Sequence, residues 1–247
     1  MQIIKTKSFE IAVYVKGDPR SSKLAIVIPG RLDTKDYIHN TSLVDLLADK
    51  NYFALSFDPP GTWESSGDID LYTTTNTIKV VDELIEYFGN KPTLLAGHSR
   101  GGTVAMLVGP TNPYVTHIIP IFSHPGAPSD PEPERVVAGK LISYRDLPPG
   151  TEKTKEQKKF ELPLSYFEDG ARYDALPGLK TYTKPKLFFF GALDVMNTPD
   201  GVKEAFDASA EPKEICGIES EHDYRLRAEA VREVNSKIGK FLENFTW

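Results

Sequence analysis

Hydrophobic residues along this chain gather in short continuous runs instead of alternating with polar ones. Five such runs follow one another: KLAIVIPG (23–30), YFALSFD (52–58), TLLAGHS (93–99), HIIPIFS (117–123) and KLFFFGALD (186–194). A weaker sixth is KEICGIES (213–220). Continuous runs of this length are typical of strands that are buried on both faces, as in a parallel sheet covered by helices.

The segments between these runs have the period of a helix. Residues 76–89 carry apolar side chains three or four positions apart and end at a glycine, which is a helix stop signal. A similar stripe near the end of the chain is formed by Leu226, Ala230, Val234, Ile238, Phe241 and Phe245. Strands that alternate with helices predict an α/β protein with a doubly wound, mostly parallel central sheet.

One stretch interrupts this alternation. Residues 125–185 are rich in proline and charge, with scattered aromatic residues, and we expect either a small helical cap or a long irregular excursion between two strands. The segment EKTKEQKK (152–159) is interpreted as a solvated helix face. We therefore expect a single domain over residues 1–247, with 125–185 as a cap-like insertion.

Composition narrows the class of protein. The chain has 247 residues, 40% apolar and 26% charged, which is ordinary for a soluble globular protein. A net charge of −6 without a basic cluster argues against nucleic acid as a partner. The single cysteine, Cys216, excludes an internal disulfide and suits a cytoplasmic location. The start alternates polar and apolar residues, unlike a signal peptide, and no apolar run is long enough to span a membrane. The oligomeric state stays open.

The run TLLAGHS leads into a motif that carries chemistry. Residues 97–101, Gly-His-Ser-Arg-Gly, fit G-x-S-x-G between a predicted strand and a predicted helix, the context of a nucleophile elbow. Glycines two positions either side of the serine let neighbouring backbone pass closely, and the following helix directs its free N–H groups at the site. The alternative, a tight turn that needs glycine for packing, does not explain the hydroxyl. We predict that Ser99 is a nucleophile.

A serine nucleophile needs a base, and the chain has five histidines. His222 follows the last predicted strand, so its loop is expected to lie over the strand ends near Ser99. His98 lies inside the elbow and His124 ends a strand, which makes both possible pocket residues. His39 lies in or near the first helix, and His117 starts a strand.

The base in turn needs a carboxylate that orients it. Asp194 directly follows the penultimate strand, so Ser99, Asp194 and His222 follow one another in the order nucleophile, acid, base. Asp194 could instead cap a helix, and His222 could be a solvated loop residue, but both alternatives together are less consistent with the elbow. Asp130 and Asp169 are weaker candidates because they lie in the insertion.

With these residues in place, the chain resembles the α/β-hydrolase superfamily over nearly its whole length. GHSRGG matches the nucleophile motif, GALDVMNTP is similar to the acid loop, and SEHD occupies the place of the histidine loop. DPPGTWESSG is similar to the segment D-x-x-G-x-G-x-S, with Trp63 where the second glycine usually stands. Trp63 could line the pocket or pack the loop, and packing is the favoured interpretation.

The resemblance also implies an oxyanion hole made of backbone N–H groups. One donor is expected from Arg31, after Gly30 and with Pro29 in place of the histidine that is common in the family; the other is expected from Arg100. Two guanidinium groups beside the site would favour a substrate with a carboxylate. The preferred alternative is that both side chains point to solvent or pair with acids such as Asp33 and Asp36.

The predicted reaction is hydrolysis of a small or medium carboxylic ester through an acyl-enzyme, as in a carboxylesterase, without metal or organic cofactor. A lipase is less expected because the insertion is charged instead of broadly apolar. The same triad of serine, histidine and acid also cleaves thioesters, amides and carbon–carbon bonds. The resemblance in fold therefore does not decide which of these bonds the protein cleaves. A perhydrolase or haloperoxidase-like activity and a non-catalytic small-ligand receptor of the same fold also stay open.

Overall fold

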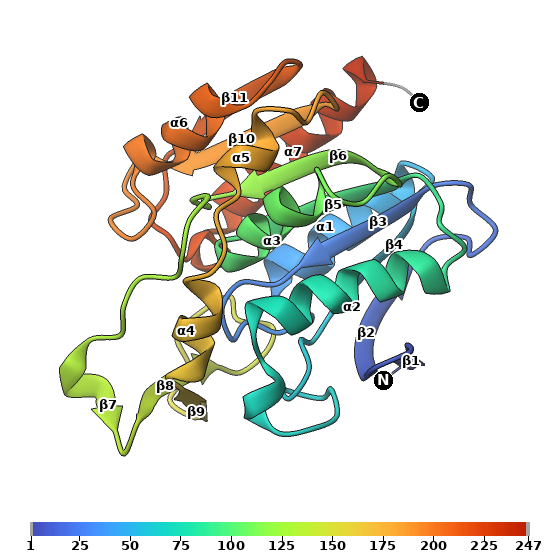
Figure 1. Cartoon of the computed structure of the whole chain (residues 1–247). Coiled ribbons are helices and arrows are strands. Elements are labelled where there is room, and N and C mark those ends of the chain that lie inside the picture. The colour runs from blue at the N-terminus through green and yellow to red at the C-terminus, as the bar shows by residue number, and fades with distance from the viewer. Residues whose placement is uncertain (1, 246–247) are drawn as a thin grey trace.

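A computed structural model describes residues 2–245 and shows an eight-stranded sheet between two layers of helices (Figure 1). The strand order is β1-β2-β4-β3-β5-β6-β10-β11, and every neighbouring pair from β4 onward is parallel. The strands of this sheet are β1 (Gln2–Lys5), β2 (Glu10–Lys16), β3 (Leu24–Ile28), β4 (Phe53–Phe57), β5 (Thr93–His98), β6 (Val115–Ile121), β10 (Lys186–Gly191) and β11 (Lys213–Ile218). The predicted mostly parallel sheet is confirmed.

Helices cover both faces of the sheet, as a doubly wound fold requires. The longer ones are α1 (Ile38–Asp49), α2 (Thr74–Tyr87), α3 (Arg100–Val108), α6 (Pro199–Ala208) and α7 (Ala228–Asn244). One hydrophobic cluster joins the sheet to α2, α3 and α6, and another joins it to α1 and α7 (Figure 1). The six apolar runs of the sequence are all strands. The first five are buried on both faces, whereas β11 lies at the edge of the sheet and buries fully only Ile218.

The two helices predicted from their stripes are present. In α2 the N-cap Thr73 accepts a hydrogen bond from the backbone N–H of Asn76, which satisfies one of the free donors of the first turn. In α7 the stripe is buried against the sheet at Val234, Ile238 and Phe241. The predicted stripe begins in the short helix η3 (Tyr224–Leu226), one turn before α7 itself.

The insertion is richer in strands than the sequence predicts. It contains a three-stranded antiparallel sheet and short helices, and it lies beside the main sheet (Figure 1). Its elements are η2 (Pro133–Arg135), β7 (Val136–Val137), β8 (Lys140–Asp146), β9 (Gln157–Pro163), α4 (Ser165–Gly170) and α5 (Leu176–Leu179). The insertion is therefore neither the helical cap nor the irregular excursion that we expected. It does lie between two strands of the main sheet, β6 and β10.

The segment EKTKEQKK is not a helix. Its last residues begin β9, which pairs with β8, and the residues before β9 form a turn. The apolar residues that follow, Phe160 and Leu162, are two positions apart and both are buried. A period of two together with pairing to β8 outweighs the helix propensity of the lysines and glutamates.

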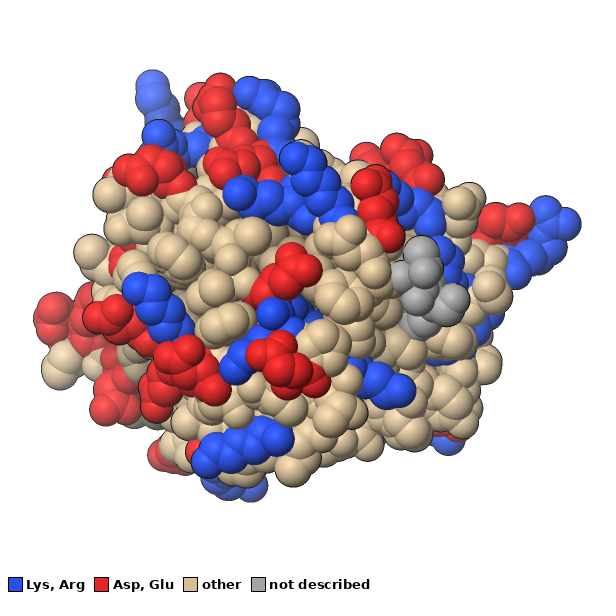
Figure 2. Space-filling view, turned by 90° about the horizontal axis from the view of Figure 1, so that it is seen from above, with Lys and Arg blue, Asp and Glu red and all other residues tan. Residues whose placement is uncertain are grey.

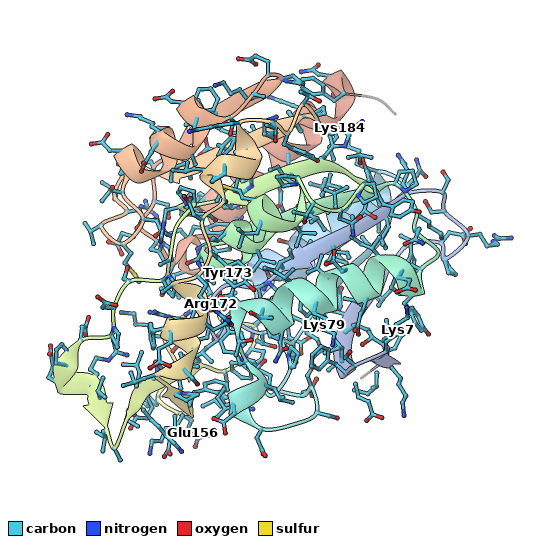
Figure 3. All side chains as sticks on the ribbon, in the orientation of Figure 1. Lys7, Lys79, Glu156, Arg172, Tyr173 and Lys184 are labelled. Carbon is cyan, nitrogen blue, oxygen red and sulfur yellow. The ribbon has the colours of Figure 1, made fainter. Side chains whose placement is uncertain are left out.

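Side-chain contacts attach the insertion to the helix layer. Asp169 in α4 accepts hydrogen bonds from the backbone N–H and the hydroxyl of Thr75 at the start of α2. Tyr173 and Arg172, labelled in Figure 3, lie beside the same end of α2, and the Tyr173 hydroxyl is 2.6 Å from the Thr75 hydroxyl. Asp169, the weaker candidate for the acid, thus binds Thr75 and attaches the insertion to α2.

The outer surface over α6, β11 and α7 mixes both signs of charge. Lysine and arginine side chains are interspersed with aspartate and glutamate on this face, without a broad area of one sign (Figure 2). Within residues 2–245 no helix combines the length and the apolar character needed to cross a membrane.

Candidate active site

Ser99 stands at the turn between β5 and α3, at the carboxyl edge of the sheet. Its backbone φ is 53° and its ψ is −122°, a conformation that a non-glycine residue rarely adopts. A Cβ on Gly101 would come within 2.0 Å of the Ile28 carbonyl oxygen, and one on Gly97 within 2.4 Å of the Gly101 backbone. The two glycines of the motif are therefore required by close backbone approach, which is the reason expected from the sequence.

The three side chains predicted to act together lie in one hydrogen-bonded chain. His222 Nε2 is 2.8 Å from Ser99 Oγ, and His222 Nδ1 is 2.7 Å from Asp194 Oδ2. Each side chain follows a strand of the sheet: Ser99 follows β5, Asp194 follows β10 and His222 follows β11. Because the carboxyl ends of parallel strands share one edge, residues distant in sequence meet there.

Asp194 is held as a carboxylate by its surroundings. Its side chain is fully buried, and burial alone would raise the pKa. Hydrogen bonds from His222 and from the backbone N–H groups of Met196 and Asn197 outweigh burial, so the pKa lies below its ordinary value. Asp194 does not cap α6, because Thr198 is the N-cap of that helix. A charged Asp194 can stabilise a protonated His222.

Beneath the site lies a buried group that the sequence did not reveal. His98 Nε2 is 2.9 Å from the carbonyl oxygen of His222, and its Nδ1 is 3.5 Å from Asp33 Oδ2. Since a carbonyl only accepts, His98 Nε2 carries the hydrogen. Burial alone would raise the pKa of Asp33, but His98, Arg145 and His39 outweigh it and lower that pKa. His98 therefore supports the loop of His222 from below.

The same group is the one place in residues 2–245 where three potential metal ligands converge. Asp33, His39 and His98 offer ligand atoms within 4.8 Å of one another. The Arg145 guanidinium lies 3.8 Å from Asp33 and already places a positive charge there, which disfavours a metal cation. Burial lowers the pKa of His39 to about 3, so His39 is neutral at pH 7. We interpret the group as an ion pair between Asp33 and Arg145, and the expected absence of a metal stays a prediction.

The loop after β3 brings Arg31 to the same edge as Ser99. Within the described residues, no acceptor takes a hydrogen bond from the backbone N–H of Arg31 or of Arg100. The Arg31 carbonyl oxygen accepts a hydrogen bond from Arg145 of β8, so the insertion holds this loop in place. Gly30 leaves room for the buried group, since a Cβ there would lie 2.7 Å from Asp33 Oδ2.

Within the described residues neither of these arginine side chains pairs with an acid, and both line the pocket over Ser99. Arg100 is buried and donates to the Thr74 hydroxyl and to the carbonyl oxygen of Gly126 in the insertion, so it neither points to solvent nor pairs with an acid. Arg31 is half-buried, with its guanidinium carbon 6.0 Å from the Phe167 ring centre. Asp33 pairs with Arg145 instead, and Asp36 pairs with Lys35 at 2.7 Å.

Trp63 packs the loop and does not line the pocket over Ser99. Its indole N–H donates to the Leu32 carbonyl oxygen at 2.9 Å, and its ring contacts Tyr37 and Phe160 edge-on. Its backbone φ is 44°, so the position keeps the left-handed conformation for which glycine is favoured. These contacts agree with the interpretation that the sequence favours, in which Trp63 packs the loop.

A pocket of about 210 Å³ opens above Ser99 between the strand ends and the insertion. His98 and His124 line it, as their positions predict, and His124 also accepts a hydrogen bond from the backbone N–H of Gly126. Burial lowers the pKa of His124, and the nearby Arg100 adds to this effect. His117 lies within β6, away from this pocket, and Asp130 is exposed in the insertion.

Comparisons with known proteins agree with this arrangement. The family model described as the alpha/beta hydrolase fold matches residues 25–119. None of the curated proteins matches the chain significantly. Among solved structures, Est1E from Butyrivibrio proteoclasticus with ferulic acid bound is 17% identical, with 99% of this chain and 98% of that chain covered and a TM-score of 0.77.

Two further structures have similar scores. Alpha/beta hydrolase domain-containing protein 10 from mouse is 17% identical, with 99% of each chain covered and a TM-score of 0.77. The thioesterase domain from the curacin biosynthetic pathway is 15% identical, with 96% of this chain and 97% of that chain covered and a TM-score of 0.71. Strand order, site position and these comparisons together lead to one conclusion: the chain has the α/β-hydrolase fold, as its motifs predict.

Proposed function

We propose that the protein is a serine hydrolase that cleaves small or medium carboxylic esters through an acyl-enzyme. The observation that carries the proposal is the hydrogen-bonded chain from Ser99 through His222 to the buried Asp194. A serine hydroxyl becomes an effective nucleophile when a base accepts its proton, and the base acts best when a carboxylate orients it.

In the first half of the reaction, Ser99 Oγ attacks the ester carbonyl carbon while His222 Nε2 takes the hydroxyl proton. The carbonyl oxygen becomes an oxyanion, which the backbone N–H groups of Arg31 and Arg100 stabilise. His222 then gives its proton to the leaving alcohol as the carbon–oxygen bond of the ester breaks. Asp194 stays ionised throughout and stabilises the imidazolium.

In the second half, water attacks the acyl-enzyme. His222 takes a proton from the water, the oxyanion forms again in the same hole, and Ser99 leaves with the proton that His222 returns. The products are a carboxylic acid and the regenerated enzyme. Met196 and Asn197 hold Asp194 in place during both halves through their backbone N–H groups.

The size of the pocket supports a small substrate. A volume of about 210 Å³ lies below the range of roughly 300–1,000 Å³ that is usual for drug-sized ligands, and most of the lining residues have polar side chains. A long acyl chain therefore fits poorly, which makes a lipase the weaker alternative. A thioester would react by the same steps, and one structure of similar fold is a thioesterase domain.

Hydrolysis of p-nitrophenyl esters from acetate to palmitate tests the proposal. We expect hydrolysis that is fastest with short acyl chains, and a loss of about 10⁴-fold or more in kcat for Ser99→Ala. Ser236→Ala, at an exposed position of α7, is the matched control and should keep wild-type rates. Equal rates in Ser99→Ala and wild type would overturn the proposal. Fast cleavage of acyl thioesters with slow cleavage of esters would favour the thioesterase.

A further inference from the structure

The pocket above Ser99 is rich in positive charge, although the chain as a whole carries −6. Four arginines line it against two aspartates, Asp33 and Asp223. The arginines are Arg31, Arg100, Arg135 and Arg145. Three of them come from different parts of the fold: the loop after β3, the start of α3 and strand β8. Such a concentration of one sign in a cleft attracts ligands of the other sign.

The two carboxylates of the pocket are already engaged by cations of the protein. Asp33 is buried, and its cation is Arg145, whose guanidinium lies 3.8 Å away. Asp223 lies 3.9 Å from Arg225, which is outside the pocket lining. Neither acid lies within ion-pair distance of Arg31, so these carboxylates do not neutralise the charge of Arg31.

Arg31 is the arginine of this pocket that keeps its guanidinium available. Within residues 2–245, no carboxylate lies within 4 Å of it and no acceptor takes a hydrogen bond from its side chain, which contacts the Phe167 ring. Arg135 differs, because Glu132 lies 3.3 Å away. Arg100 and Arg145 each use their terminal nitrogens within the protein.

We propose that the substrate carries a carboxylate close to the ester that is cleaved, and that Arg31 binds this carboxylate. The inference rests on the proposed function and names the substrate class of that same site. Arginine and a carboxylate form two parallel hydrogen bonds, which fix orientation as well as charge. A monoester of a short dicarboxylic acid has this chemistry, and its hydrolysis releases an alcohol and the dicarboxylic acid.

The test compares substrates that differ only in charge. Mono-p-nitrophenyl esters of succinate, glutarate and adipate are measured beside the same esters with the free carboxyl capped as a methyl ester, after subtraction of the rate without enzyme. A second pair places the charge on the leaving side: 4-carboxyphenyl acetate against 4-carbamoylphenyl acetate. We expect kcat/KM to be about tenfold higher or more for the charged member of at least one pair, as is typical of a hydrogen bond between charged groups.

The variant Arg31→Gln keeps the backbone N–H but removes the charge. The readout is the ratio of kcat/KM within each pair, which we expect to fall to about one in this variant and to decrease with ionic strength in wild type. Arg232→Gln, at an exposed arginine of α7 paired with Glu229, is the matched control and should keep the wild-type ratio. A charged preference that survives in Arg31→Gln would overturn the assignment to Arg31.

A binding readout separates this inference from the proposed function. Glutarate should slow the labelling of Ser99 by a fluorophosphonate more than glutaramide does, and Arg31→Gln should remove the difference. Equal effects of the two compounds, with Ser99 still labelled, would overturn the inference and leave the serine hydrolase intact. If inorganic phosphate slowed the labelling of Ser99 more than glutarate does, the assignment of the ligand as a carboxylate would be overturned. Absence of labelling with no ester hydrolysis would overturn the proposed function itself.

Discussion

Ser99 stands in a backbone conformation that is unfavourable for any residue with a side chain, and the residues around it explain how it is held there. The turn is closed by contacts that only glycines allow, and His222 and Asp194 complete the arrangement from two other strand ends. The motif and the order of these residues can be predicted from sequence, because a fixed spacing encodes the turn. The supporting contact of His98 with the His222 carbonyl has no such spacing, since it joins residues 124 positions apart.

Gly101→Ala tests the close packing of this turn. The new Cβ would come within 2.0 Å of the Ile28 carbonyl oxygen, so backbone must shift, and we expect the free energy of unfolding to fall by about 2 kcal/mol or more. Urea denaturation measures this change. Gly201→Ala in α6 is the control, because its nearest atom is 3.6 Å away and alanine favours a helix by roughly 0.5–1 kcal/mol. Equal stabilities of the two variants would contradict the packing argument.

At the scale of elements, the insertion and the histidine loop are joined by a buried ion pair. Asp146 at the end of β8 lies 2.6 Å from Arg225 in η3, three residues after His222. The Arg225 guanidinium carbon also lies 4.6 Å from the Tyr37 ring centre, and the Tyr37 hydroxyl donates to the Asp146 carbonyl oxygen. The insertion therefore positions the loop that carries the proposed base.

Arg225→Met removes this ion pair while keeping an unbranched side chain over Tyr37. Asp146 is then left buried without its cation, and we expect a loss of about 3–5 kcal/mol in the free energy of unfolding. Arg232→Met, whose pair with Glu229 is exposed, should cost less than about 1 kcal/mol. Urea denaturation measures the free energy of unfolding of both variants. Similar losses in the two would show that the buried pair of Asp146 stabilises the fold no more than an exposed pair does.

The same pair predicts a dependence of stability on pH. Burial alone would raise the pKa of Asp146, but Arg225 and Gln157 outweigh it and lower the pKa to about 2. Because the pKa is about 3.9 in the unfolded chain, this carboxylate stabilises the fold above pH 4, and the contribution disappears as pH falls toward 2. Wild type should therefore lose more stability than Arg225→Met between pH 5 and 2.5 in urea denaturation. Parallel pH curves would contradict this assignment.

At the element scale the sequence was least informative in the insertion. The inner strands of the main sheet, β3, β4, β5, β6 and β10, could be predicted because both of their faces are apolar. In contrast, β9 has one apolar face that begins only at Phe160 and follows a lysine-rich stretch. Its pairing with β8 depends on contacts across the fold, and so does the position of Arg145 beside Asp33. Neither relation has a local sequence signal, so Arg31 and Arg100 could be placed beside the pocket from sequence but Arg145 could not.

For the molecule as a whole, the insertion does not have a separate hydrophobic core. Its buried residues Leu141, Phe160 and Tyr166 form one cluster with Leu32 and Tyr72 of the main body. We therefore expect residues 1–247 to unfold as one cooperative unit, although Met1, Thr246 and Trp247 lie outside the described residues.

The fluorescence of Trp63 reports on this cluster, because its ring contacts Phe160 of the insertion. In a Trp247→Phe background, Trp63 is the remaining tryptophan of the chain. Its fluorescence and the far-ultraviolet circular dichroism of the whole chain should change at the same urea concentration. An earlier fluorescence transition would show that the insertion unfolds separately and that the single-domain prediction is wrong.

Covalent labelling of Ser99 tests most directly whether this serine is an activated nucleophile. The folded protein is treated with a fluorophosphonate, and the adduct is counted by intact mass and located by peptide mapping. We expect one adduct per chain, on Ser99, and a labelling rate that falls about a thousandfold or more in His222→Ala because the base is lost. An unlabelled Ser99 in the folded protein, or an adduct that forms equally fast without His222, would contradict this expectation.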